Sequence, residues 1–396
     1  MHFLKADKIF PVTSSPITGG VIVIDDAGVI QDILKSDAGI ESGNIEHFEG
    51  FLIPGFVNTH CHTELSWAKG LISKANGLNN FIVDLEKAKT NIAEEEKAIL
   101  ISYSLKEMER SGIVAVADIS NTFNSISAKK GSSLYFHNFI EIFGSDEKNA
   151  EAIFNKALAL ESDFKAQLPG NSASITPHAT YSVSSALFSL ISNYNKQLIS
   201  IHHQENEDEN EFYKYGTGKL AERRKLFNPE AAEWSATGKS PVESISQYLD
   251  SQTKTLLVHN TVSKAEDVEF AQKYFSDLFW CLCPNANLYI ENRLPDIEMM
   301  ISKRCRITLG TDSLASNDEL SILSEMKTVL KNFPALTFDE ILKWATLNGA
   351  GLLGKSATLG SFEKGKSPGV VHISGVGNEI EKLRNAVSQL IIPAKP

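Results

Sequence analysis

The stretch Phe51-Leu-Ile-Pro-Gly-Phe-Val-Asn-Thr-His-Cys-His62 decides the fold that we predict for this chain. Its apolar run breaks at Pro54-Gly55, resumes, and ends at two histidines separated by one residue. In an extended strand, residues i and i+2 point to the same side, so both imidazoles can reach one metal ion. The alternative for this motif taken alone is a pair of packed or surface histidines.

The same arrangement, an apolar run followed by a polar residue, recurs along the chain. Its later instances end at His178, His202, His259 and Asp312. Helix-like segments lie between the runs, such as 92–110, which Gly112 follows as a stop signal. Short buried strands that alternate with helices predict βα units and a parallel sheet. About 300 residues of this pattern is the size of a (β/α)8 barrel.

The two ends of the chain have a different character. Val21–Ile24 is a β-branched run between a glycine pair and a turn, and 365–373 also has the pattern of a turn and a strand. Because both ends of the chain have strand patterns and flank the predicted barrel, they can pair into one small β domain. The polar segment 205–239 is long, and we expect it to be a lid or binding loop.

Composition and charge narrow the class of protein. The 396 residues carry a net charge of −11, which disfavours nucleic acid and anionic membranes as partners. No run approaches the roughly 18 apolar residues of a spanning helix, and the first residues lack the apolar core of a signal peptide. Four cysteines are too few for a disulfide framework. We therefore expect a cytoplasmic protein with a small-molecule substrate, and a homodimer is the assembly that we consider.

The strand-end residues are candidates for a metal site. In a barrel, catalytic groups lie at the C-terminal ends of the strands, and histidine with aspartate suits zinc or iron. Either His202 or His203 could be a ligand, and we prefer His202 because the run from Leu198 leads straight into it. Glu205 follows three residues later, although it begins an acidic run that is typical of a solvated face. The alternative for Asp312 is a helix N-cap.

The ordered motifs resemble the amidohydrolase superfamily, and more narrowly its branch that deaminates purines, pterins, triazines and adenosine-type nucleosides. The resemblance covers nearly the whole chain. The matching stretches are 54–62 (PGFVNTHCH), 176–181 (TPHATY), 201–205 (IHHQE), 258–260 (VHN), 283–288 (CPNANL) and 309–317 (LGTDSLASN).

This resemblance implies an architecture and a cofactor. The fold would be a (β/α)8 TIM barrel over residues 54–357, with a small β-sandwich built from 1–53 and 358–396. One divalent metal ion, Zn²⁺ or alternatively Fe²⁺, would be held by His60, His62, His202 and Asp312. Binuclear members use a carboxylated lysine at the end of the fourth strand, and we find no convincing lysine there. His259 would then be a non-ligand that orients the attacking water.

Finer features resemble one group within this branch. His60-Cys-His-Thr-Glu-Leu-Ser66 and the stretch around Glu141 are similar to the aminodeoxyfutalosine deaminases of menaquinone biosynthesis. The chain departs from the branch after the first strand, where 77–82 stands in place of a clear G-G-F-x-x-W element. S-adenosylhomocysteine or methylthioadenosine deaminase, guanine deaminase, and an amide or cyclic-imide hydrolase on the same scaffold are the competing functions.

The resemblance also assigns roles to single residues. Asp312 would take a proton from the water, His259 would direct the water, and Glu205 would donate a proton to the ring nitrogen beside the amino-bearing carbon, so that ammonia leaves. A positioned acid contributes about 10²–10⁴-fold. The candidate substrate contacts are Glu64, Glu141, His178 and Arg293. Arg293 could bind a substrate carboxylate through its fork of N–H donors, or it could be an ordinary surface arginine.

Overall fold

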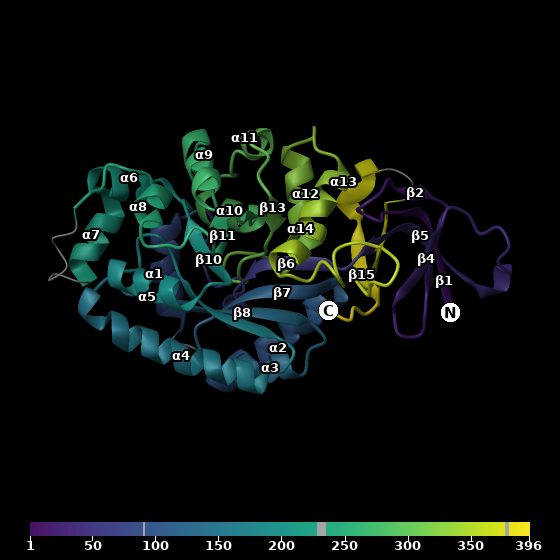
Figure 1. The fold of residues 1–396 in the computed structure, drawn as a ribbon, viewed down its shortest axis with the longest axis horizontal. Coiled ribbons are helices and arrows are strands. Elements are labelled where there is room, and N and C mark those ends of the chain that lie inside the picture. Colours follow the sequence, from purple (N-terminus) through teal and green to yellow (C-terminus); the bar gives the residue numbers. More distant parts are fainter. Residues whose placement is uncertain (90–91, 228–234, 377–379) are drawn as a thin grey trace.

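Parallel strands with helices between them form the centre of the molecule (Figure 1). The computed structural model describes residues 1–89, 92–227, 235–376 and 380–396. Eight of the described strands form two four-stranded parallel sheets. Their order is β6 (Phe56–Cys61), β7 (Ile113–Ser120), β8 (Tyr135–Ile142) and β9 (Ser172–Pro177) in one, and β10 (Leu198–His203), β11 (Lys254–His259), β12 (Leu278–Leu282) and β13 (Ile307–Leu309) in the other.

These strands are buried almost throughout, which is why they appear in the sequence as continuous apolar runs. One of these strands overlaps each of the predicted runs at 113–118, 172–177, 198–202, 255–259, 279–283 and 306–312. The strand β8 was not predicted, because polar residues interrupt its apolar pattern.

Hydrogen bonds connect the two sheets where their outer strands end. The His202 amide of β10 donates to the His178 carbonyl just after β9, at 2.9 Å. The Thr311 amide just after β13 donates to the His60 carbonyl of β6, at 3.0 Å. The carboxyl ends of the first and last strands of this series therefore lie beside each other, although they are about 250 positions apart in the sequence.

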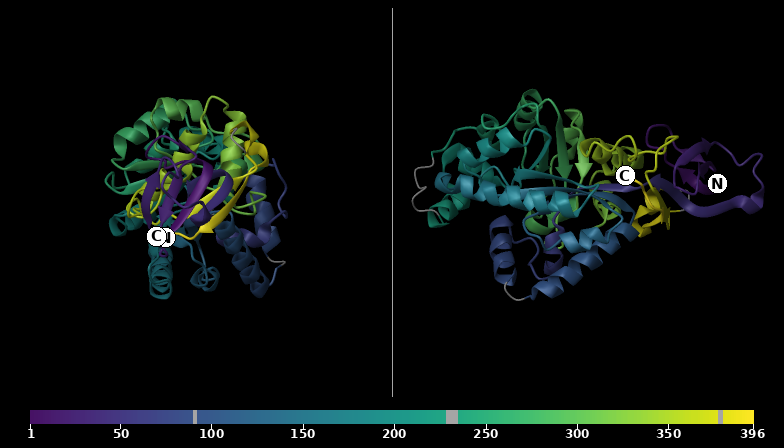
Figure 2. Two further views of the ribbon diagram at one scale, coloured as in Figure 1. Left: turned by 90° about the vertical axis from the view of Figure 1, so that its right-hand side faces the viewer. Right: turned by 60° about the horizontal axis from the view of Figure 1, so that its bottom comes forward.

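Helices cover the parallel sheets (Figures 1 and 2). The predicted helix at 92–110 is confirmed as α2 (Glu94–Arg110), and Gly112 follows it with a φ of +99°. Among the described residues, no helix combines the length and the apolar character that crossing a bilayer requires. The other helices that flank the strands are α1 (Leu78–Lys89), α3 (Ile126–Lys130), α4 (Ala150–Gln167), α5 (Ser185–Tyr194), α8 (Pro241–Ser246), α9 (Ala265–Tyr274), α10 (Pro284–Glu291), α11 (Ile297–Ser302), α12 (Ile322–Asn332), α13 (Phe338–Ala345) and α14 (Leu347–Leu352).

Strands from both ends of the chain join in one mixed sheet, at the right of Figure 1. Its order is β15 (Val387–Ile392), β14 (Val370–Ser374), β5 (Ile45–Pro54), β1 (His2–Ile9), β3 (Val21–Ile24) and β4 (Ile30–Leu34), with β2 (Ile17–Thr18) paired to β1. The predicted pairing of the two chain ends is thus confirmed, whereas the two facing layers of a sandwich stay a prediction. Gly55 separates this sheet from β6, and a Cβ there would overlap Val114 and the Pro368 carbonyl.

The segment 205–239 is largely helical, so its prediction as a loop was wrong. It contains α6 (Glu207–Tyr215) and α7 (Gly218–Phe227), while 228–234 lie outside the described residues. Acidic residues in the first turn of α6 suit the positive end of the helix dipole, and Phe212 and Tyr213 give it a buried side. Gly216 ends α6 in the left-handed conformation, with a φ of 71°.

Candidate active site

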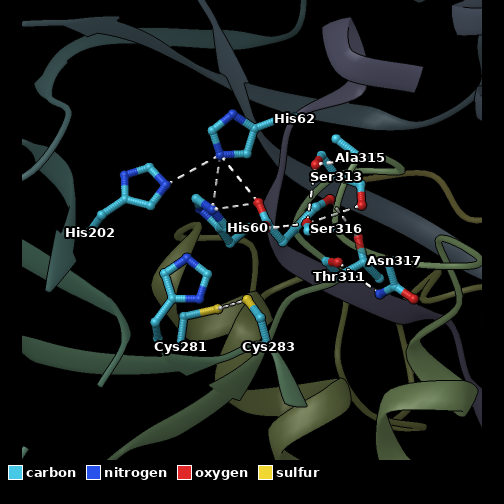
Figure 3. A network of polar contacts seen from close by, with 12 residues as sticks. His60, His62, His202, Cys281, Cys283, Thr311, Ser313, Ala315, Ser316 and Asn317 are labelled. Carbon is cyan, nitrogen blue, oxygen red and sulfur yellow. Dashed lines mark hydrogen bonds and ion pairs between the residues drawn. The ribbon is translucent and has the colours of Figure 1, made fainter. Parts of the chain in front are cut away.

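Four side chains converge at the carboxyl ends of β6, β10 and β13. The Nε2 atom of His62 lies 3.1 Å from Nε2 of His60 and 3.2 Å from Nε2 of His202. The Oδ1 atom of Asp312 lies 3.5 Å from Nε2 of His60 and 3.4 Å from Nε2 of His62. Figure 3 shows the three labelled imidazoles pointing toward one another.

These separations fit one metal ion. Ligand atoms that surround a tetrahedral zinc at about 2.0–2.2 Å lie roughly 3.3–3.6 Å from one another. A hydrogen bond between two rings could satisfy only one of the close contacts of His62, whereas a central cation would satisfy them all. Burial also favours the neutral, ligating form of histidine, because it lowers the pKa of His60 to about 3 and that of His202 well below its usual value. His60, His62, His202 and Asp312 therefore form a metal-site candidate.

Hydrogen bonds fix the orientation of several of these groups. Nδ1 of His202 donates to the His178 carbonyl at 2.8 Å, which leaves the Nε2 lone pair facing the cluster. Oδ2 of Asp312 accepts a hydrogen bond from the Ser316 hydroxyl at 2.5 Å, which leaves Oδ1 for the cluster. The pKa of Asp312 lies well below its usual value because the neighbouring histidines outweigh the cost of burial.

His259 lies next to the cluster on β11. Its Nδ1 donates to the Asn287 amide oxygen at 3.0 Å, so Nε2 keeps a lone pair. That Nε2 lies 3.8 Å from Oε1 of Glu205. The backbone at these strand ends is strained, with φ values of 72° at His259 and 55° at Asp312. Such left-handed non-glycine residues are concentrated at functional sites.

Glu205 is buried and lies at the edge of this cluster. Burial is the main cause that raises its pKa well above the usual value, and Asp312 and Glu291 add to the effect. Its side chain is therefore protonated over a much wider pH range than that of an ordinary glutamate. The alternative prediction of a solvated acidic face does not hold for Glu205 or Glu209, which are 7% and 0% exposed.

Glu209 is a structural residue that the sequence analysis missed. Its carboxylate accepts hydrogen bonds from the backbone amides of Gln204 and Glu205 and from the Thr180 hydroxyl. Burial raises the pKa of Glu209 to about 8. Glu209 thereby fixes the backbone that carries Glu205. Its spacing of four residues from Glu205 was visible in the sequence, but its neighbours in an acidic run hid the signal.

The predicted substrate contacts have different surroundings. Glu141 and His178 lie beside His202, and their possible ligand atoms all fall within 4.8 Å of one another. Glu64 instead binds the loop after β7, because its carboxylate accepts hydrogen bonds from the Asn121 and Thr122 amides and the Ser125 hydroxyl. Burial raises the pKa of Glu64 to about 7.

Arg293 lies farther out, at the rim of a cavity that Glu205 also lines. It is half exposed and forms an ion pair with Glu207 at 3.0 Å. Asn79, Lys219 and Glu291 also line this cavity. The position leaves both interpretations of Arg293 open, as a contact for a distal substrate group and as a surface arginine.

A buried ion pair, also missed in the sequence analysis, holds the segment after the His-x-His motif. Nζ of Lys129 lies 2.5 Å from Oδ2 of Asp118, and both side chains are fully buried. Asp118 in turn accepts hydrogen bonds from the Thr63 amide and hydroxyl, at 2.9 and 2.8 Å. The pair thus fixes the residue that directly follows His62.

The fold and the site together define a class of protein: an α/β protein with a histidine and aspartate metal-site candidate at the carboxyl ends of its parallel strands. The model of the amidohydrolase family matches residues 51–388, and the chain belongs to that family. It is accordingly an enzyme that acts on C–N bonds other than peptide bonds.

Several similar proteins are deaminases of nucleosides. The chain is 26% identical over 323 residues to aminodeoxyfutalosine deaminase of Nitratiruptor sp., covering 78% of this chain and 76% of that protein. It is 29% identical over 364 residues to adenosine deaminase of Helicobacter pylori, covering 87% and 83%. The crystal structure of an adenosine deaminase from Xanthomonas campestris with bound zinc has a TM-score of 0.77 at 19% identity, covering 98% of this chain and 90% of that one. Hydrolytic deamination of nucleosides is the activity that these relatives support.

Proposed function

We propose that this enzyme hydrolytically deaminates the aromatic ring of an adenosine-type nucleoside, replacing the ring amino group by oxygen and releasing ammonia. The observation that carries the proposal is the buried Glu205, whose Oε1 lies 3.8 Å from Nε2 of His259 beside the metal-site candidate of His60, His62, His202 and Asp312. Burial raises the pKa of Glu205 well above its usual value, which favours the acid form. Amide hydrolysis needs no acid beside a ring nitrogen, whereas ring deamination does.

We further propose that the eight parallel strands close into a (β/α)8 barrel at 54–357, with 1–53 and 358–396 as the second domain.

We propose His60, His62, His202 and Asp312 as the ligands of one divalent ion, with Zn²⁺ favoured over Fe²⁺. Three imidazoles and a carboxylate suit zinc, and the zinc in the similar adenosine deaminase supports the choice. When bound, the ion supplies a water molecule whose pKa is lowered toward about 7.

The protein's own groups then move the protons. Nε2 of His259 accepts a hydrogen bond from the attacking water and directs it, because Nδ1 is engaged by Asn287. Asp312 accepts the proton that the water loses. Glu205 donates its proton to the ring nitrogen next to the amino-bearing carbon, so that negative charge does not accumulate in the ring during attack. Asp312 would return the proton of the water to the amino group, so that ammonia departs. Glu205 would regain a proton from the new hydroxyl group as the ring carbonyl forms.

The substitution Glu205→Gln tests this assignment. It removes the transferable proton and keeps the size of the side chain, so we expect ammonia release to fall by about 10²–10⁴-fold. Metal content, measured by atomic emission, should stay at the wild-type level. The matched variant His60→Ala should lose both metal and activity. A Glu205→Gln enzyme that keeps most of its activity would show that the proton comes from elsewhere.

Aminodeoxyfutalosine is the substrate that we propose, which would place the enzyme in menaquinone biosynthesis in the cytoplasm. The similarity to the Nitratiruptor enzyme and the motif around Glu64 and Glu141 support this choice. A half-exposed Arg293 at the rim could meet its benzoate group. An ammonia-release screen should rank aminodeoxyfutalosine above S-adenosylhomocysteine, methylthioadenosine, adenosine and guanine. Preference for any of the other four compounds would overturn the choice of substrate.

A further inference from the structure

We propose that Glu141 accepts a hydrogen bond from a sugar hydroxyl of the substrate, so that the enzyme selects ribonucleosides over deoxyribonucleosides and free bases. The inference rests on the proposed deaminase function and adds to it a recognition site for the sugar.

One oxygen of Glu141 lacks a partner although it is buried. The residue lies near the end of β8 and is 7% exposed. The Asn121 side-chain amide donates to Oε2 at 3.2 Å and to the Glu141 carbonyl at 3.0 Å, which holds the carboxylate in place. Oε1 accepts no hydrogen bond within the described parts of the chain. Burying an acceptor without a donor costs free energy, so a hydrogen bond from the substrate to Oε1 would favour binding.

A neighbouring ring N–H group does not serve this oxygen. Nδ1 of His202 lies 3.4 Å from Oε1, but its proton points to the His178 carbonyl at 2.8 Å. Because that nitrogen carries a proton, it has no lone pair for a metal ion. Glu141, His178 and His202 are therefore poorly suited to form a second metal site. Oε1 is left as an acceptor for a ligand.

His178 places a second polar group next to this acceptor. Its Nδ1 pairs with the Ser182 hydroxyl at 2.8 Å, which leaves Nε2 as the ring atom for a ligand. One carboxylate oxygen of Glu141 and one ring nitrogen of His178 lie within 4.8 Å of each other, so neighbouring hydroxyls of a ribose could meet both side chains. Glu64 is a weaker candidate for this role, because protein donors already occupy both of its oxygens.

The position also fits the orientation of a nucleoside. Its ring must present one nitrogen to Glu205, which follows β10, and the amino-bearing carbon to the metal-site candidate. Glu205 lies beside His259 of β11, which is the neighbour of β10 on one side. On the opposite side of β10, His202 pairs with Ala179 just after β9, and β8 follows β9 in the sheet. The substituent on the ring would therefore extend toward Glu141, and in a nucleoside this substituent is the sugar.

The variant Glu141→Gln tests the proposal at this one atom. Asn121 donates to the Oε2 position, so the new amide should place its oxygen there and its NH₂ group at the Oε1 position, where it cannot accept. We would measure kcat/KM for adenosine, 2′-deoxyadenosine and 3′-deoxyadenosine. A hydrogen bond to a charged acceptor is worth about 10- to 100-fold. The wild type should prefer adenosine to at least one deoxy analogue by that factor, and Glu141→Gln should lose the preference because kcat/KM falls more for adenosine than for that analogue.

Binding and metal measurements complete the test. In the Glu205→Gln background, calorimetry should show that Glu141→Gln weakens adenosine binding but not binding of the same deoxy analogue, with unchanged metal content. Glu161→Gln is the matched control, because Glu161 is equally buried but pairs with Tyr194 and Lys165 on the helical layer. It should keep the wild-type preference.

The outcomes separate the inference from the proposed function. If neither aminodeoxyfutalosine nor any of these three nucleosides is bound or deaminated, the proposed function fails, and the sugar site fails with it. If adenosine is deaminated without a preference over either deoxy analogue, or if Glu141→Gln keeps the preference, only the sugar site is refuted. Loss of metal in Glu141→Gln would also refute it, because Glu141 would then act by positioning His202.

Discussion

At the scale of single residues, the site depends on buried charged groups whose partners lie on neighbouring strands. Lys129 illustrates this: its ammonium group has Asp118, the Ser120 hydroxyl and the Asn138 amide oxygen as partners, and the rings of Phe136 and Phe164 lie nearby. The cost of removing these charges from water is offset only while both partners are present.

We predict that Asp118→Asn lowers the free energy of unfolding by about 3–5 kcal/mol, because it leaves a buried ammonium group without its counter-charge. The double variant Asp118→Asn with Lys129→Met should recover most of that loss. Urea denaturation followed by circular dichroism measures both values. A single variant within 1 kcal/mol of the wild type would mean that the pair is not important for stability.

The candidate ligands could be proposed from the sequence, but their supporting residues could not. His60, His202 and Asp312 each follow an apolar run, and the position of such residues in a barrel is a general rule. Glu209 and Lys129 carry no comparable local pattern, since a charged residue in a helix is normally exposed. Only the folded chain shows that these two are buried against the segments that carry Glu205 and His62.

At the scale of secondary-structure elements, the close approach of β6 and β13 determines the site. Gly310 lies at this contact, where a Cβ atom would fall 2.7 Å from Cβ of His60 and 2.8 Å from Sγ of Cys281. Strands that carry regular apolar runs were predictable, but β8 was not. Its polar residues have specific partners, such as His137 with the Ser174 hydroxyl and Asn138 with Lys129, and these are set by tertiary structure.

We predict that Gly310→Ala separates β6 from β13, lowers the free energy of unfolding by about 1–3 kcal/mol, and weakens zinc binding. Thermal unfolding and a chelator competition assay measure the two effects. Gly43→Ala is the control, because nothing lies within 4 Å of its added Cβ, and it should change neither value. If Gly310→Ala binds zinc as tightly as the control, the spacing of these strands does not determine the geometry of the ligands.

At the scale of the whole molecule, burial of neutral histidines makes stability depend on pH. Burial lowers the pKa of His137 to about 4, from 6.5 in an exposed histidine, and that of His203 also to about 4. Between about pH 4 and pH 6.5, each of these two histidines binds a proton in the unfolded chain but stays neutral in the folded chain. The free energy of unfolding therefore falls as the pH decreases from about 6.5 to about 4.

We predict that His137→Gln removes part of this dependence. Its free energy of unfolding should decrease less steeply than that of the wild type below pH 6.5, by up to about 1.4 kcal/mol per pH unit, which corresponds to one proton. Urea denaturation at half-unit steps from pH 4.5 to 7 measures the difference. Parallel curves for the two proteins would show that His137 does not exclude a proton in the fold.

The central claim is that four side chains from distant parts of the chain hold a single divalent ion. Anomalous X-ray diffraction from crystals of the zinc-loaded enzyme, measured on both sides of the zinc absorption edge, tests it most directly. We predict one peak per chain, within about 2.0–2.2 Å of the ligand atoms of His60, His62, His202 and Asp312. Two peaks per chain would favour the amide or cyclic-imide hydrolase, and no peak among these four residues would contradict the claim.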